Sequence, residues 1–335
     1  MSIIFIENRS LLKHYFIPIF IVVTSLFIFL SSCDKKEKTR QQTLIIQIDS
    51  LLYQSESSIF KDYGTSVKYA QKALQLSKLS DYEEGTITAN RNLALANNQK
   101  GFHHLAFKQI DTAILLASNI KNEELLALSK QTKGYIYFTI SKFDSAYLWY
   151  MSSLPFFENS EDKHELSNLY SKIGRVYYNK SEFDHAYIYY QKALTITKEF
   201  GDEKAIAREL NNIGSVYEFQ NKKTEALIYF HEALKLNLKS NRKEWIAINY
   251  HNIAKIFSDD NEYDSANIYF EKALKIDQEL GNNSYIAEDL FSWGIHYQKF
   301  KEHHLAIKYF KEAEILCKET NNLSTLRRIY DALSS

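Results

Sequence analysis

Asparagine side chains recur at intervals of 40 residues, or multiples of 40, at Asn92, Asn212 and Asn252. A side-chain amide both donates and accepts hydrogen bonds, so a row of amides could hold an extended peptide by its backbone without reading its side chains. Other polar residues share the same predicted helix faces. The candidate partner-binding residues are Arg91, Asn92, Arg175, Arg208, Asn211, Asn212, His251, Asn252 and Lys255. The alternative interpretation is that these side chains only meet solvent or cap local loops.

Metal binding and catalysis find little support in the sequence. The pairs His103-His104 and His303-His304 fall in predicted turns between helices, where another segment has Phe183-Asp184, so we interpret them as turn variants. There is no His-Glu-x-x-His helix, Gly-x-Ser-x-Gly turn, glycine-rich phosphate loop or paired-cysteine motif. We therefore predict that the chain is not an enzyme. No metal, cofactor or small-molecule substrate is expected.

The composition favours a helical protein. Lys and Arg number 41 and so do Asp and Glu, so the chain lacks the basic excess that nucleic-acid binders use. Only 9 Gly and 2 Pro occur among 335 residues, too few for a sheet with many tight turns. The hydrophobic content of 45% is that of a folded protein. The elements that position the candidate partner-binding residues must therefore be helices joined by short connections.

The N-terminus reads as a targeting segment. Arg9 and Lys13 precede an apolar run from Tyr15 to Leu30, which is short for a membrane-spanning helix of about 20 residues. The run ends in Leu30-Ser31-Ser32-Cys33, which resembles the bacterial lipobox. That resemblance implies cleavage before Cys33 and acylation of its sulfur and its new amine. An uncleaved N-terminal anchor is the alternative.

These features divide the chain. We predict a lipoprotein signal peptide over 1–32, a charged tether over 33–42 that follows the acylated Cys33, helical repeats over 43–320 and a capping helix over 321–335. The chain would then be lipid-anchored in the bacterial cell envelope, since two or three acyl chains hold a protein firmly on a membrane. The charged tract after Cys33 does not distinguish between the inner membrane, the outer membrane and the cell surface as the location of the protein.

An internal repeat of 40 residues fills most of the chain. Small residues recur at that spacing in three sets, namely Ala106, Ala146, Ala186, Ala226, Ala266 and Ala306; Ala73, Ala113, Ala193, Ala233, Ala273 and Ala313; and Gly134, Gly174, Gly214 and Gly294. Each period contains two amphipathic helical patterns. A Gly inside a helix costs about 1 kcal/mol relative to Ala. Gly at one slot of four repeats therefore indicates a close approach between the two helices.

The repeat resembles the tetratricopeptide repeat. The motif stands as Gly174-x-x-Tyr177 with Ala186-x-x-x-Tyr190, and again as Gly214-x-x-Tyr217 with Ala226-x-x-x-Phe230. The usual terminal Pro is absent and the period is 40 instead of about 34, which resembles a long-helix subclass of peptide- and cargo-binding adaptors. The resemblance implies an all-α, right-handed superhelical α-solenoid of about seven helix pairs. Its first helices would line a concave groove.

This resemblance implies a non-catalytic scaffold that binds a peptide or protein partner in the groove. In the long-helix subclass, Asn residues in segments like Leu210–Gly214 contact the peptide. A complete set of residues for clamping a C-terminal carboxylate is not found. Two other functions stay open: the sensory input of a histidine kinase or transcriptional regulator, and an outer-membrane or pilus assembly lipoprotein.

Overall fold

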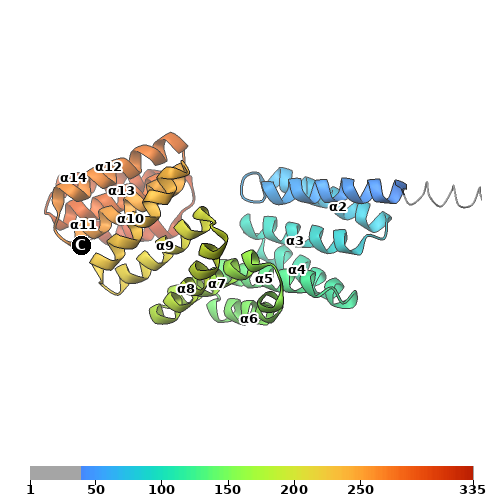
Figure 1. The fold of residues 1–335 in the computed structure, drawn as a ribbon. Coiled ribbons are helices and arrows are strands. Elements are labelled where there is room, and N and C mark those ends of the chain that lie inside the picture. The colour runs from blue at the N-terminus through green and yellow to red at the C-terminus, as the bar shows by residue number, and fades with distance from the viewer. Residues whose placement is uncertain (1–38, 335) are drawn as a thin grey trace, which may run out of the picture. The chain divides into compact units, whose positions relative to one another are not determined.

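The computed structural model describes residues 39–334, and every regular element within that range is a helix. Two compact units divide between Ser153 and Leu154, inside one of the helices. Figure 1 labels the helices along the chain. The first unit contains a helix over residues 39–58, then α2 (Tyr63–Leu79), α3 (Glu83–Gln99), α4 (His103–Asn119), α5 (Glu123–Thr139) and the start of α6 (Phe143–Asn159). The second contains the rest of α6, then α7 (Lys163–Asn179), α8 (Phe183–Phe200), α9 (Glu203–Phe219), α10 (Lys223–Lys239), α11 (Lys243–Asp259), α12 (Tyr263–Leu280), α13 (Asn283–Lys299), α14 (His303–Glu319) and α15 (Leu323–Ser334).

Short turns with a left-handed residue separate most of the helices. Among residues 39–334, twelve have positive φ, and all but one neighbouring pair of them lie 20 residues apart: Asp81, Gly101, Lys121, Ser141, Ser181, Gly201, Asn221, Asn241, Asn261, Gly281, Lys301 and Asn321. The amide that follows each of them donates to a carbonyl five residues back, as Lys222 N does to Tyr217 O at 2.9 Å. This is the Schellman ending of a helix. The 40-residue sequence period is therefore two helices of nearly equal length.

The recurrent glycines bring the two helices of a pair together. A Cβ added to Gly174 would lie 2.8 Å from the ring of Tyr190, and one added to Gly214 would lie 2.7 Å from the ring of Phe230. Gly134 faces Tyr150 and Gly294 faces Phe310 in the same way. These rings are almost fully buried. The missing Cβ therefore makes room for an aromatic ring of the second helix, which is the steric demand that the sequence indicated.

The predicted fold class is confirmed. The helices form seven consecutive pairs, beginning with residues 39–58 and α2 and ending with α13 and α14, and α15 follows the last pair. The first helix begins at residue 39, so residues 39–42 are helical although they were assigned to the tether. Arg and Gln in this stretch are good helix formers, which explains the difference.

The predicted signal peptide and Cys33 lie outside the described residues. Within residues 39–334, no helix combines the length and apolar character that crossing a membrane requires.

Candidate partner-binding face

The candidate residues lie on the first helices of four pairs. Arg91 and Asn92 are on α3 of the first unit, and the other seven are on α7, α9 and α11 of the second. In the second unit we use the name first-helix face for a set of polar side chains on α7, α9, α11 and α13. Its members are Asn168, Arg175, Arg208, Asn212, His251, Asn252, Lys255 and Ser292.

Asn92 is not open to a partner, although it was predicted as a partner-binding residue. Its side chain is 1% exposed, and its Nδ2 donates to the carbonyl of Leu52 at 3.0 Å, from the preceding first helix. A buried amide that is bonded in this way is not available to a peptide. Asn92 therefore connects two repeats. Arg91, its neighbour on α3, is half-buried.

A buried carboxylate organises α9. Glu209 is fully buried and accepts from Arg208 Nε at 2.7 Å and from Asn212 Nδ2 at 3.1 Å. A second guanidinium nitrogen of Arg208 donates to Asn168 Oδ1 on α7 at 3.0 Å. Arg208 and Asn212, both predicted site residues, are thus brought together by an acid that the sequence reasoning missed. A polar residue at this slot in successive repeats, at 209, 249 and 289, was the available signal.

Amides join α9 to α11. Asn211 Oδ1 accepts from Asn249 Nδ2 and from Asn252 Nδ2, each at 3.0 Å, and Asn249 Oδ1 accepts from Asn237 Nδ2 at 2.8 Å. Asn211 is 8% exposed, so the expectation that its side chain is open to a peptide partner is wrong. Its side chain packs inward because Asn249, which is buried on the next first helix, needs an acceptor for its Nδ2. Asn212 and Asn252 are half-buried, which leaves part of each side chain at the surface.

The remaining predicted residues of α11 are also bound to neighbouring helices. His251 Nδ1 lies 2.6 Å from Asp289 Oδ1 of α13, and its Nε2 lies 3.4 Å from Ser292 Oγ. Lys255 Nζ pairs with Glu218 Oε1 of α9 at 2.6 Å. Arg175 on α7 is exposed. Successive first helices are therefore linked by polar contacts that also orient the side chains of the face.

A small pocket opens beside Lys255. It has a volume of about 120 Å³, and its lining residues are Lys255, Ser258, Asp259, Phe270, Phe291, Ser292, Ile295 and Arg328. The guanidinium of Arg328 lies 4.4 Å from the ring centroid of Phe291 and donates to Glu288 Oε2 at 3.0 Å. Apolar rings and cationic rims together suit an amphipathic side chain of a partner.

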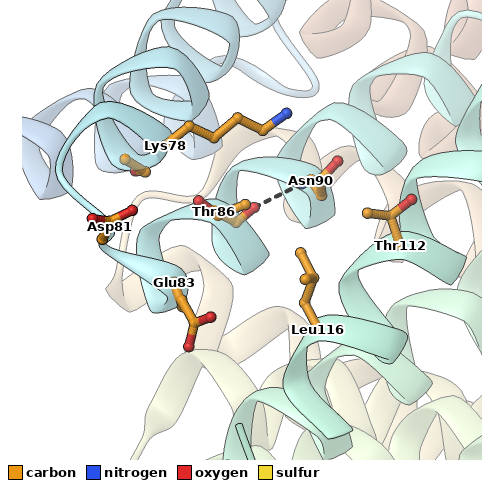
Figure 2. A pocket seen from close by; sticks show the side chains of 8 residues that line it. Lys78, Asp81, Glu83, Thr86, Asn90, Thr112 and Leu116 are labelled. Carbon is orange, nitrogen blue, oxygen red and sulfur yellow. Dashed lines mark hydrogen bonds between the residues drawn. The ribbon is translucent and has the colours of Figure 1, made fainter. Parts of the chain in front are cut away.

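A larger pocket lies in the first unit, at the ends of α2, α3 and α4. Its volume is about 400 Å³, and Figure 2 shows its lining side chains Ser77, Lys78, Asp81, Glu83, Thr86, Asn90, Thr112 and Leu116. Asn90 Nδ2 donates at 2.8 Å to the carbonyl of Thr86, one turn earlier on α3 (Figure 2). None of the predicted residues lines it. Since three helices supply the lining, helical periodicity could not reveal this pocket.

The histidine pairs sit differently from the prediction. His103 and His303 are the first residues of α4 and α14 and do not lie in the turns. His103 Nδ1 lies 3.1 Å from Asn98 Oδ1 of the preceding helix. Over residues 39–334, no group of three or more His, Cys, Asp or Glu side chains is placed to hold a metal ion.

A match to a sequence family agrees with the repeated helix pairs. The family model described as tetratricopeptide repeat matches residues 165–239 and 210–279, which cover α7 to α12. Residues 165–279 are tetratricopeptide repeats. Outside this range, most turns keep the same left-handed residue, and Gly134 and Gly294 occupy the same slot against an aromatic ring. No curated protein sequence matches the chain.

Solved structures with the same fold include two complexes. A Rap protein complexed with competence and sporulation factor has a TM-score of 0.63 and 16% identity, over 86% of this chain and 87% of that one. The Rap conjugation gene regulator of plasmid pLS20, in complex with the Phr* peptide, has a TM-score of 0.54 and 16% identity, over 86% and 95%. At these identities the tetratricopeptide repeat fold is what the chains share.

A third similar structure belongs to a signal transduction ATPase. It is the STAND protein with a tetratricopeptide repeat sensor from Pyrococcus horikoshii, with a TM-score of 0.63 and 19% identity. The similarity covers 84% of this chain and 43% of that one.

Proposed function

We propose that the chain is a non-catalytic scaffold that binds a peptide or protein partner on the first-helix face. The observation that carries the proposal is the pair of half-buried amides, Asn212 and Asn252, one on each of two successive first helices. Each is oriented by a hydrogen bond to its own protein, to Glu209 or to Asn211. Amides oriented in advance lose little side-chain entropy when a peptide binds.

The comparisons support this proposal in outline. Two of the similar structures are complexes, one with competence and sporulation factor and one with the Phr* peptide. A tetratricopeptide repeat stack that presents polar side chains on its first helices suits the same kind of partner. The partner would lie along α7 to α13 and insert one side chain into the pocket beside Lys255.

The binding proposal is tested by capture of the partner in living cells. Crosslinking followed by mass spectrometry identifies the partner, and its affinity is then measured with the purified chain. A hydrogen bond contributes about 1 kcal/mol, so Asn212→Ala with Asn252→Ala should weaken binding about 30-fold. Helicity should stay unchanged. The matched control replaces Lys235 and Lys275, which are exposed on second helices, with Ala and should bind as the wild type does.

Two results would count against the binding face. Equal affinity of the double asparagine variant and the wild type would remove the first-helix face from the proposal. Equal weakening by the lysine control would mean that binding depends on the other side of the repeats.

We also propose that a lipid on Cys33 holds the scaffold in the bacterial cell envelope. The support is the sequence Leu30-Ser31-Ser32-Cys33 at the end of an apolar run. Cys33→Ser should abolish labelling by an alkyne fatty acid and move the protein out of the membrane fraction. Ser32→Ala, which keeps a small residue before the cysteine, is the control that should still be labelled. Labelling of Cys33→Ser would refute the anchor.

A sensory role is the second candidate. One similar structure carries its tetratricopeptide repeats as a sensor within a signal transduction ATPase. Under this hypothesis the crosslinked partner would be a kinase or a transcriptional regulator. A partner without any output domain would favour the simple scaffold.

A further inference from the structure

Two neighbouring repeats carry the same polar cluster in different chemical forms. In the first, Asn211, Asn237 and Asn249 join α9, α10 and α11 through amides. Exactly one period later in the sequence, 40 residues on, the same slots hold His251, Asp277 and Asp289 on α11, α12 and α13. The first cluster is neutral at any pH near 7. The second consists entirely of ionisable groups.

The two aspartates are buried next to each other. Asp277 is 3% exposed and Asp289 is 2% exposed. Asp289 Oδ1 lies 2.6 Å from His251 Nδ1, whereas Asp289 Oδ2 and Asp277 Oδ1 are buried and accept no hydrogen bond from a protein donor among the described residues. Two carboxylates cannot donate to each other. A single proton held between them would supply the missing donor and remove one buried charge.

The charged groups around Asp277 act in the same direction. From α11 it meets the negative Glu244, and from α13 it meets Asp289 and the phenol of Tyr285. Burial, followed by the charge of Asp289 and the hydrogen bond to it, raises the pKa of Asp277 from 3.8 to about 7, and Glu244 adds to this. His251 on α11 contacts Asp289, with Nδ1 2.6 Å from Oδ1.

We propose that Asp277 and Asp289 form a buried proton-binding site, and that its proton holds α12 and α13 together and fixes His251 at the first-helix face. With the proton present, one carboxyl group donates to the other and Asp289 keeps its contact with His251. When the proton leaves, two adjacent carboxylates repel each other in a site with little access to water. The packing of α11, α12 and α13 is then weakened.

The sign of the pH dependence follows from proton linkage. The folded protein keeps a proton that the unfolded chain releases above about pH 4. The stabilising effect is complete below that pH and is lost as the pH rises through about 7. The unfolding equilibrium constant should therefore rise about tenfold per pH unit well below pH 7 from this one group, and about 50-fold in all between pH 5 and pH 7.

Asp277→Asn tests the proposal with the residue that the preceding repeat uses. The amide can donate to Asp289 permanently, so the variant should lack this pH dependence and should be more stable than the wild type at pH 8. Urea unfolding of the full chain at pH 5, 6, 7 and 8 measures both. Identical pH dependence in the two proteins would overturn the proposal.

Two further measurements keep the test decisive. Asn237→Asp places a carboxyl group in the neutral cluster and should add a pH dependence of the same sign. If Asp277→Asn fails to fold, ¹³C NMR of the aspartate carboxyl groups in the wild type tests the shared proton directly. A carboxyl group that titrates near pH 7 would support it, and titration of both carboxyl groups near pH 4 would refute it. The role of His251 at the first-helix face rests on the proposed function. The stability and NMR measurements need no partner, so the proton-binding site and the partner-binding face can be refuted separately.

Discussion

Adding one methyl group at Gly214 tests how the helix pairs are held together. In the structure, a Cβ at Gly214 would lie 2.7 Å from both Cδ1 and Cε1 of the Phe230 ring. Carbon atoms in contact normally lie about 3.5–4.0 Å apart, so the ring or the helix must move by about 1 Å. Overpacking of this kind costs about 1–3 kcal/mol, and Ala gains about 1 kcal/mol over Gly inside a helix. Gly214→Ala should therefore destabilise the protein by roughly 0–2 kcal/mol.

The decisive measurement repeats this change without the ring. In a Phe230→Leu background the clash is relieved, and only the helix preference of Ala remains. Gly214→Ala should then stabilise by about 1 kcal/mol, so the effect of one substitution changes sign between two backgrounds. The assay is the midpoint of urea unfolding followed by circular dichroism, at unchanged slope.

The chain offers a matched control for this cycle. Ala254 occupies the same slot, opposite Phe270, and already carries a methyl group there. Ala254→Gly should cost about 1 kcal/mol from helix preference. If Gly214→Ala had the same sign and size with and without the Phe230 ring, close packing against that ring would not be the reason for glycine.

Three other predictions concern single groups. Burial lowers the pKa of His296 to about 4, so its contribution to stability is present above about pH 6.5 and is lost as the pH falls towards 4. Urea unfolding of His296→Gln should lack about 3 kcal/mol of this acid destabilisation. Cys317 is fully buried and burial raises the pKa of its thiol, so in a Cys33→Ser background a thiol reagent should modify it only after unfolding. Asp202 caps α9 by accepting from the amide of Ala205 at 3.2 Å, and Asp202→Ala should lower the free energy of unfolding by about 1 kcal/mol, measured in urea.

Much of the fold could be predicted from residue spacing alone. The recurrence of glycine at Gly174 and Gly214 predicted that two helices approach closely. In the structure the nearest group of the second helix is an aromatic ring, that of Tyr190 or Phe230. Such features repeat in every period because each helix pair meets the same neighbours. Repetition within one chain therefore revealed the contacts that all repeats share.

The candidate face could be predicted only in part. Asn211 and Asn212 are adjacent in the sequence, and helical periodicity assigned both to the polar side of α9. In the structure Asn211 is buried and accepts from Asn249 and Asn252, whereas Asn212 stays half-buried. Successive residues point about 100° apart on a helix, so the rotation of α9 against α11 separates them.

By itself, the sequence determined the class of fold, the number of helix pairs and the slots where small residues are required. These depend on local helix preference and on contacts that every repeat makes. Tertiary structure alone decided which polar side chains are buried and what they contact. It placed Glu209 beneath Arg208 and brought Asp277 beside Asp289, because these contacts depend on how far each helix turns towards its neighbours. Burial then changed a carboxyl group from a surface charge into a group that holds a proton near neutral pH.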